Sequence, residues 1–304
     1  MTGIDELVSI IIPTYNRGDV ISRSIKSALR QTYTCTEIIV VDDCSEDNTE
    51  RIIKDNFGNR VKYIKHDANR GGSAARNTGI KSANGDYLAF LDSDDEWVEN
   101  KLELQMKYIS ASDYIGVYCD IKRIRTGNLS FLRKILREMI GGDELPGKEG
   151  GEELIRDSLL LKNFSTGGCS TILAKKEPVI QINGFDPDFP RHQDWEFRNR
   201  LLEKGKLGYV DEPLVHKYET DSPDSTTTEK ATQMYLTKFS DRIQILENEG
   251  YNVKGRHNLR LATRFFGEGN FKKGIEYFRK SKITSPKQYI TLSYSISKGV
   301  LKNR

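Results

Sequence analysis

The first hundred residues alternate between short apolar runs and longer stretches of mixed polarity. Three of the apolar runs are continuous over the length of a strand: residues 7–12 (LVSIII), 37–41 (EIIVV) and 87–92 (YLAFLD). A continuous run of this kind is typical of a strand that is covered on both faces. Residues 61–66 (VKYIKH) show a weaker pattern of the same type. We therefore predict four strands in this region.

The stretches between these runs predict helices. Apolar residues recur at helical spacing through residues 20–31 (VISRSIKSALRQ), and residues 71–83, which begin with two glycines, predict another helix. Asp47 followed by Glu50 resembles a capping box that opens another helix. Strands and helices that alternate with short connections predict an α/β fold with a doubly wound, mostly parallel sheet and helices on both faces.

Polar clusters follow three of the predicted strands. They are residues 13–17 (PTYNR), 42–47 (DDCSED) and 92–95 (DSDD). Ligands of such sheets bind beyond the carboxyl ends of the strands, so the three clusters mark a candidate site. Carboxylates that converge there repel one another unless a divalent cation neutralises them, and oxygen ligands suit Mg²⁺ or Mn²⁺.

The acidic cluster 92–95 has other interpretations. Its acids could cap a helix that starts at about Trp97, because carboxylates are favourable near a helix N-terminus. An EF-hand frame over residues 92–103 is excluded, since Trp97 occupies the position that needs glycine. Taken alone, the cluster does not decide between capping and metal binding.

Composition restricts the class of partner. The 304 residues include 47 Lys and Arg against 44 Asp and Glu, a formal charge of +3, so charge does not indicate a nucleic-acid partner. The four cysteines lie far apart without a CxxC pair, which favours reduced thiols over disulfides or a zinc site. We also expect no export signal and no transmembrane helix. The expected location is the cytoplasm, with the inner face of the membrane as an open alternative.

Residues 121–142 have a basic and an apolar face if they form a helix. Such a segment can lie on an anionic membrane or hold a lipid-diphosphate acceptor, and it can equally be an ordinary helix packed on the domain. Residues 220–230 (TDSPDSTTTEK) predict a mobile loop that can act as a lid. The tail has a helical pattern, and residues 266–286 resemble one tetratricopeptide hairpin, which must pack on the rest of the chain to be stable.

Six motifs, in order, resemble the family 2 glycosyltransferases, which have the A-type nucleotide-sugar fold. The motifs are VSIIIPTYNR (8–17), EIIVVDDCSEDNT (37–49), NRGGSAARNTGI (69–80), GDYLAFLDSDDEW (85–97), INGFDPDF (182–189) and QDWEFRNRLLEKG (193–205). The resemblance spans about residues 8–219. It implies an inverting transfer of a sugar from a nucleoside diphosphate sugar, most often UDP-linked, to an acceptor hydroxyl, with Mn²⁺ or Mg²⁺ as cofactor.

The resemblance also implies the donor site. Tyr15 offers a ring against which a base can stack, Asp43 is the acceptor for a base N–H, and Asp42 orients its loop. A packed tyrosine and a capping aspartate are the structural alternatives, and Arg70 reads equally well as a solvated charge. The implied donor-binding residues are Pro13, Thr14, Tyr15, Asn16, Asp43, Arg76, Asp92 and Ser93. The implied metal ligands are Asp94 and Asp95, with His216 less favoured.

On the acceptor side, the resemblance implies that Asp194 is the general base. The family places an acidic pair at this point, and here the first acid is replaced by Gln193. His192 is the rival base, although a single histidine in a loop is more often structural. The expected acceptor contacts are Thr166, Gly167, Gly168, Gln193 and Trp195.

These inferences divide the chain into a catalytic domain, residues 1–229, and a helical C-terminal extension, residues 230–304. The nucleotide-binding half covers about residues 1–115 and the acceptor half about 116–229. The expected partners are a nucleoside diphosphate sugar and a saccharide or lipid-linked saccharide. Two other functions stay open: an inactive nucleotide-sugar or lipid-binding module, and donor hydrolysis or nucleotidyl transfer. The chain lacks the dinucleotide fingerprint and the P-loop.

Overall fold

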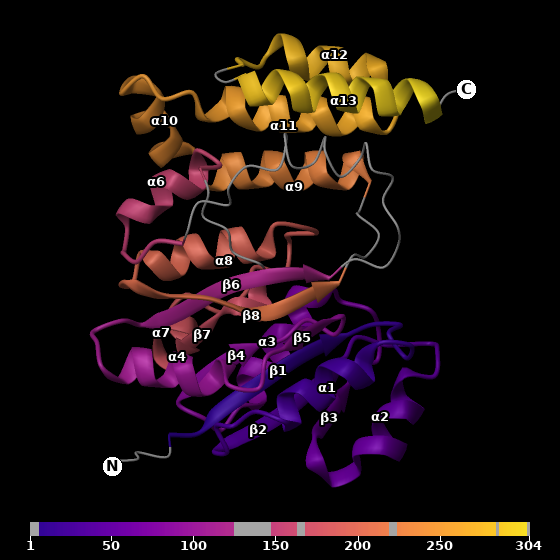
Figure 1. The fold of residues 1–304 in the computed structure, drawn as a ribbon, viewed down its shortest axis with the longest axis vertical. Coiled ribbons are helices and arrows are strands. Elements are labelled where there is room, and N and C mark those ends of the chain that lie inside the picture. The colour runs from indigo at the N-terminus through magenta and orange to yellow at the C-terminus, as the bar shows by residue number, and fades with distance from the viewer. Residues whose placement is uncertain (1–5, 125–146, 163–167, 219–223, 284–285, 303–304) are drawn as a thin grey trace.

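The computed structural model describes residues 6–124, 147–162, 168–218, 224–283 and 286–302. Its centre is an eight-stranded mixed sheet with strand order β3-β2-β1-β4-β7-β6-β8-β5 (Figure 1). The strands are β1 (Val8–Thr14), β2 (Thr36–Asp42), β3 (Lys62–Lys65), β4 (Tyr87–Phe90), β5 (Asp95–Trp97), β6 (Gly116–Ile124), β7 (Leu173–Lys175) and β8 (Leu207–Tyr218).

The four strands predicted from the apolar runs are all present and parallel to one another. β1 pairs with β2 and β4, and β2 pairs with β3. The second half of the chain completes the sheet: β7 is antiparallel to β4 and β6, β6 is parallel to β8, and β5 is antiparallel to β8. The expectation of a mostly parallel sheet is therefore confirmed, with antiparallel strands added beyond β4.

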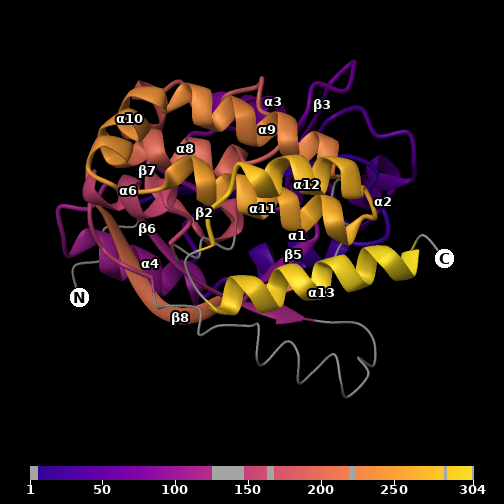
Figure 2. The same cartoon turned by 90° about the horizontal axis from the view of Figure 1, so that it is seen from above.

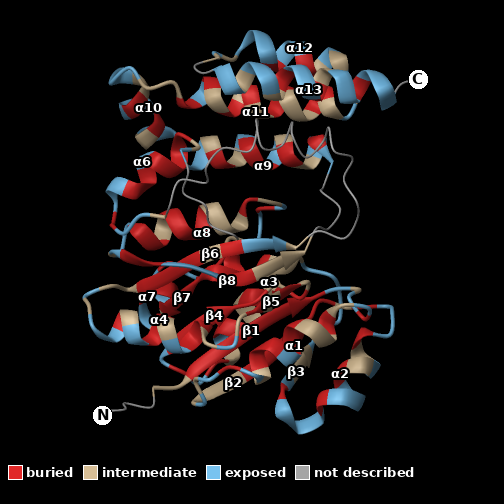
Figure 3. Ribbon diagram, in the orientation of Figure 1, coloured by how far each residue is buried: buried red, intermediate tan, exposed pale blue. Residues whose placement is uncertain are grey.

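Helices cover both faces of the sheet. They are α1 (Ile21–Leu29), α2 (Thr49–Phe57), α3 (Gly72–Ser82), α4 (Lys101–Ser110), α6 (Glu153–Leu159), α7 (Lys176–Gln181) and α8 (Gln193–Leu202), with short 3₁₀ turns at Gly58–Arg60 and Cys169–Thr171. Ile10 and Ile12 of β1 join one apolar cluster with Ile21 and Ile25 of α1. Ile11 points to the opposite face and joins a second cluster. Both faces of β1 are buried (Figure 3), which is why its apolar run has no polar alternation.

The segment after the acidic cluster is a strand instead of a helix. Residues 95–97 form β5, and the next helix, α4, begins only at Lys101, with Asn100 at its N-cap. The Trp97 side chain is buried, and its indole N–H donates to the Ser170 carbonyl at 2.8 Å. The interpretation of the acids as caps of a helix from Trp97 was therefore wrong, because β5 is fixed by its pairing with β8.

The C-terminal helices form a layer on the α8 side of the molecule (Figure 1). They are α9 (Ser225–Lys238), α10 (Ser240–Asn248), α11 (Val253–Gly267), α12 (Phe271–Arg279) and α13 (Pro286–Lys302). Tyr235, Phe239 and Ile243 of α9 and α10 belong to the same apolar cluster as the buried residues of α8. The expected boundary between residues 229 and 230 falls inside α9.

Residues 266–286, which resemble a tetratricopeptide hairpin, contain the end of α11, the whole of α12 and the first residue of α13. Helices α11 and α12 share an apolar cluster with α13 that includes Phe265, Tyr277 and Leu292, and α11 also packs on α9. The expectation that the pair rests on the rest of the chain is confirmed. In the described part of the chain, no helix has both the length and the apolar character needed to cross a bilayer.

Two segments singled out in the sequence lie partly outside the described residues. Of residues 121–142, the structure describes 121–124, which are the last part of β6 and not the start of a helix. Of residues 220–230, it describes residues from 224 onward. These residues form the start of α9, where Asp224 accepts a hydrogen bond from the Thr227 N–H, so this part of the expected loop is helical.

We predict that Phe197→Ala reduces the free energy of unfolding by about 3–5 kcal/mol, because it removes a fully buried ring. The ring stacks on Phe185 with 4.0 Å between centroids and meets the edge of Phe90 at 5.7 Å, which fixes α8 against β4. Urea denaturation measures the change. Ile245→Ala, at an exposed position, is the control and should alter stability by less than about 0.5 kcal/mol. Equal losses in the two variants would contradict this account of the core.

Candidate functional site

A cleft of about 560 Å³ lies at the carboxyl ends of β1, β2 and β4. This is the position expected for a ligand of a doubly wound sheet. Arg17, Gly72, Ala75, Asp94 and Gln193 contribute to its wall. The other lining residues are Pro13, Thr14, Tyr15, Asn16, Asp43, Arg76, Asp92 and Ser93, which are the full set that the sequence implied for donor binding.

The end of β1 and the loop after it contribute an unpaired hydroxyl and an aromatic ring to the lining of the cleft. The Tyr15 side chain is 41% exposed, so it is not the packed core tyrosine that was the structural alternative. The Thr14 hydroxyl is buried and has no hydrogen-bond partner in the described structure. Asn16 has φ of 49°, and its side-chain oxygen accepts from the Glu46 N–H at 2.9 Å. This bond fixes the loop after β1 to the loop after β2.

The two aspartates after β2 have different surroundings. Asp42 is fully buried and accepts hydrogen bonds from the Ser45 N–H and the Tyr63 hydroxyl, as expected for a residue that orients its loop. Asp43 lines the cleft, and its carboxylate accepts from the backbone N–H groups of Arg70 and Gly71.

His66 also bonds to the Asp43 carboxylate, at 2.7 Å. A carboxylate has about four acceptor positions, so three donors leave room for one more. Sequence reasoning missed that Asp43 also holds the loop before α3, where Gly71 has φ of 86°.

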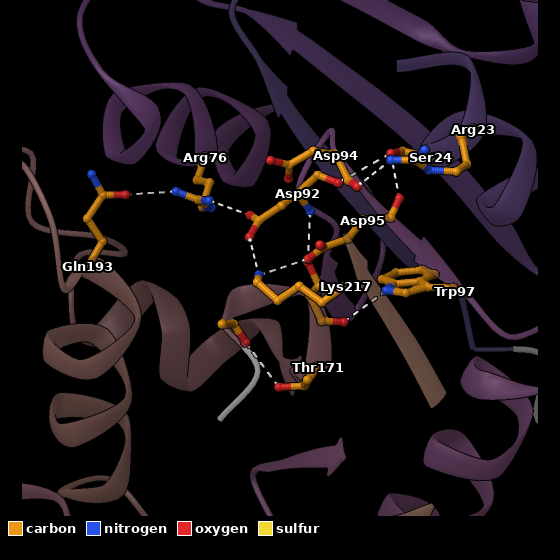
Figure 4. A network of polar contacts seen from close by, with 12 residues as sticks. Arg23, Ser24, Arg76, Asp92, Asp94, Asp95, Trp97, Thr171, Gln193 and Lys217 are labelled. Atoms are coloured by element: carbon orange, nitrogen blue, oxygen red, sulfur yellow. Dashed lines mark hydrogen bonds and ion pairs between the residues drawn. The ribbon is translucent and has the colours of Figure 1, made fainter. Parts of the chain in front are cut away.

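Arg76 connects the two walls of the cleft (Figure 4). Its Nη2 donates to Asp92 Oδ1 at 2.6 Å, and its Nη1 donates to Gln193 Oε1 at 2.9 Å. Gln193 in turn donates to the Phe189 carbonyl. Burial opposes the charge of Asp92, but Arg76 and Lys217 hold the pKa of this carboxyl below its usual value. Asp92 is therefore an anion at neutral pH.

Asp95 lies behind the cleft rather than in it. Its side chain is 1% exposed, and its Oδ2 accepts from the Ser170 hydroxyl at 2.6 Å and from Lys217 Nζ at 3.1 Å. Burial raises the pKa of Asp95 to about 7. The sequence implied Asp95 as a metal ligand, but these contacts make it the residue that anchors Lys217 and η2 (Cys169–Thr171).

Asp94 is the carboxylate that fits a divalent cation. It lines the cleft beside Asp92, and burial followed by the charge of Asp92 raises the pKa of Asp94. A cation at this point would relieve that repulsion, and a Mg²⁺ ion that also binds substrate phosphates needs only one or two carboxylates. No cluster of three or more His, Cys, Asp or Glu side chains in the described residues is arranged as an all-protein metal site.

His216 is not near these carboxylates. It pairs with Glu96 across β5 and β8, and its Nδ1 lies 3.9 Å from the Glu96 carboxylate. Because side chains alternate along a strand, the neighbouring Lys217 points the other way, toward Asp92 and Asp95. Lys217 Nζ lies 3.6 Å from Asp92 Oδ2. The less favoured assignment of His216 as a metal ligand is therefore not supported, and Lys217 is the residue that sequence reasoning missed.

A second chamber, of about 380 Å³, shares Arg76, Asp92 and Gln193 with the cleft. Asp194, in the first turn of α8, lines this chamber, and its carboxylate has no hydrogen-bond or ion-pair partner in the described structure. Gly168, with φ of 84°, also lines it. Thr166 and Gly167, the other predicted acceptor contacts of that loop, lie outside the described residues.

His192 lines the chamber, and Trp195 packs behind it. Their rings stack with 4.3 Å between centroids, and Arg260 of α11 lies over the Trp195 ring at 4.3 Å. Burial, together with nearby arginines, lowers the pKa of His192 to about 2, so its imidazole is neutral and a very weak base. Trp195 is absent from the lining of the chamber, and its contacts with His192 and Arg260 make it a support of α8. Its role as an acceptor contact stays a prediction.

Comparisons with known proteins agree with this site. The model of the family described as glycosyl transferase family 2 matches residues 9–177, more than half of the chain. The UDP-Glc:alpha-D-GlcNAc-diphosphoundecaprenol beta-1,3-glucosyltransferase WfgD of Escherichia coli is 34% identical over 206 residues, which are 68% of this chain and 74% of that protein.

Two solved structures show the same fold. The complex of TarS 1–349 from S. aureus with UDP-GlcNAc has a TM-score of 0.59 at 15% identity and covers 96% of this chain and 92% of that one. The mannosyltransferase PcManGT from Pyrobaculum calidifontis, with GDP-Man and Mn²⁺, has a TM-score of 0.58 at 16% identity and covers 97% and 86%. The fold is the α/β GT-A fold, and the chain belongs to glycosyl transferase family 2.

Proposed function

We propose that this protein transfers a sugar, with inversion, from a nucleoside diphosphate sugar to an acceptor hydroxyl. The favoured donor is UDP-linked, and the acceptor is a saccharide or a lipid-linked saccharide of a cell-surface polysaccharide, used in the cytoplasm at the inner face of the membrane. One observation carries the proposal: the donor-binding residues line a single cleft, and Asp194 lines a chamber that shares a wall with it.

The donor would lie along the carboxyl ends of β1, β2 and β4. The exposed Tyr15 ring supports stacking of a base, and the remaining acceptor position of Asp43 suits an N–H of uracil. Among the compared proteins, WfgD is named for UDP-Glc and the TarS complex contains UDP-GlcNAc, which favours UDP over GDP. PcManGT contains GDP-Man, so guanine nucleotides belong in the same binding screen.

Asp94 would hold the divalent cation, with Asp92 as its neighbour. When bound, the cation supplies positive charge that neutralises the leaving diphosphate. Lys217 and Arg76 flank Asp92 and keep it ionised. Both side chains line the chamber, and Arg76 also lines the cleft. Their charges would favour the negative charge that develops on the diphosphate as its bond to the sugar breaks.

Asp194 would take the proton of the acceptor hydroxyl. The hydroxyl oxygen then forms a bond to the anomeric carbon on the side opposite the breaking bond to diphosphate. An inverting reaction needs a base on the acceptor side, away from the metal carboxylate, and Asp194 is the unpaired carboxylate of the chamber. The low basicity of His192 counts against the rival assignment.

We expect Asp94→Asn to abolish metal-dependent binding of UDP, because it removes the cleft carboxylate that would hold the cation. Calorimetry with UDP in the presence and absence of Mn²⁺ measures this effect. Glu99→Gln, at an exposed acid just beyond β5, is the matched control and should bind UDP as the wild type does. Unchanged metal dependence in Asp94→Asn would refute the assignment.

Asp194→Asn should keep the UDP affinity within a few-fold and lower the rate of sugar transfer by roughly 10² or more, the usual scale for loss of a general base. His192→Gln is the comparison and should lower the rate by less than about tenfold, because a neutral, weakly basic imidazole cannot serve as the base. The measurement is product formation with each UDP-sugar. Near-normal turnover of Asp194→Asn, or a larger loss of turnover in His192→Gln, would mean that the base is another residue. If the wild type forms no product, an inactive binding module would be favoured.

A further inference from the structure

A groove of about 820 Å³ lies between α11 and α13, and Leu160 and Leu161, which directly follow α6, also line it. It is larger than the donor cleft and contributes nothing to the chemistry described above. Figure 2 shows α13 running along one side of the α11–α12 pair. The groove is lined by five cationic side chains, Arg256, Arg260, Arg264, Lys298 and Lys302, against the single carboxylate of Glu268.

The three arginines form a stripe on one face of α11. They are spaced four residues apart, so successive side chains point the same way. Arg264 pairs with Glu268 at 3.8 Å, but the Nε of Arg256 is buried without a partner in the described structure. Cationic side chains in a row repel one another, and a single carboxylate offsets only part of this repulsion. A bound polyanion would offset the rest and accept hydrogen bonds from the guanidinium groups.

Arg260 connects the groove with the acceptor chamber. It lines the groove and lies 4.3 Å over the Trp195 ring, which stacks on His192 in the wall of the chamber. Arg191 lines the chamber, and burial followed by the charge of Arg264 lowers the pKa of Arg191. Burial, helped by Arg191 and Arg264, lowers the pKa of Arg260 to about 10. The charges of these three arginines therefore act on one another. Arg191 and Arg260 are also within electrostatic reach of the Asp194 carboxylate.

Apolar surface accompanies the positive charge. Leu160, Leu161, Leu259 and Tyr294 also line the groove. The outer face of α13 exposes further apolar side chains, including Tyr289 (60% exposed) and Leu301 (71% exposed). The helix carries lysines and no acidic residue, a pattern that suits contact with an anionic lipid surface.

We propose that the groove between α11 and α13 binds the diphosphate and the first part of the lipid chain of a lipid-linked sugar acceptor. This proposal rests on the proposed function, since it extends the acceptor site beyond Asp194. When a sugar is bonded directly to a diphosphate, only the width of its ring separates its hydroxyls from the phosphates. Its hydroxyl would meet Asp194 in the chamber, the phosphates would meet Arg260 and its neighbours, and the lipid would pass Leu259 and Tyr294.

The test measures binding without turnover. The donor cleft is first saturated with UDP and Mg²⁺, and farnesyl diphosphate or inorganic pyrophosphate is then titrated by calorimetry. We expect the wild type to bind farnesyl diphosphate more tightly than pyrophosphate. The double variant Arg256→Gln, Lys298→Gln should bind farnesyl diphosphate at least about tenfold more weakly, because it loses two charged donors.

Lys287→Gln is the matched control, because it removes one charge from α13 outside the groove. It should bind farnesyl diphosphate within about twofold of the wild type, and all variants should keep the UDP affinity. If the double variant does not fold, the exposed single variant Lys298→Gln carries the test, with an expected loss of about threefold. If the wild type does not bind UDP, the result counts against the proposed function. Failure of the proposed function and failure of the groove proposal therefore give different results.

Equal affinity of the wild type for pyrophosphate and farnesyl diphosphate would overturn the lipid assignment. No loss in the groove variants, or the same loss in Lys287→Gln, would overturn the site itself. Steady-state kinetics separates loss of acceptor binding from loss of catalysis. The groove variants should raise the KM for a diphosphate-linked acceptor and keep kcat, whereas substitution of the base should lower kcat.

Discussion

The hydrogen bonds of Arg76 hold the site together. The guanidinium donates to Asp92 at the end of β4 and to Gln193 at the start of α8, and it lies 5.3 Å over the Phe185 ring. These two bonds connect α3 with the end of β4 and the start of α8. Loss of either partner would leave a buried charge or polar group unpaired, which is strongly destabilising. Gln193 fits this position as a neutral acceptor, which leaves Asp194 as the free carboxylate beside it.

The acidic loop depends on a balance of charge. Asp92, Asp94 and Asp95 follow β4 within four residues, and Lys217 reaches two of them from β8. Asp95 is buried and bonds to Lys217, and Asp94 lines the cleft. The charges of Arg76 and Lys217 keep Asp92 ionised. Three similar side chains thus have three different roles, which their depth and neighbours decide.

The C-terminal helices are part of the site and not only an appendage. Arg260 of α11 lies on Trp195, which stacks on His192 at the start of α8. Asn199, which is also in α8, donates a hydrogen bond to the Tyr235 hydroxyl of α9. The helix that carries Asp194 is therefore held from above by α9 and α11 and from below by Phe90 of the sheet (Figure 1).

The sequence by itself determined the parallel half of the sheet, the strand-end clusters and the residues of the donor cleft. The first two features follow from continuous apolar runs and from polar residues placed directly after them, which are local patterns. The residues of the donor cleft follow from the resemblance of the motifs to family 2 glycosyltransferases. Only the tertiary structure decided that β5 is a strand, that Lys217 and not His216 reaches the acids, and that Arg76 meets Gln193. Each of these depends on pairing between segments far apart in the chain, and no local pattern encodes the register that brings them together.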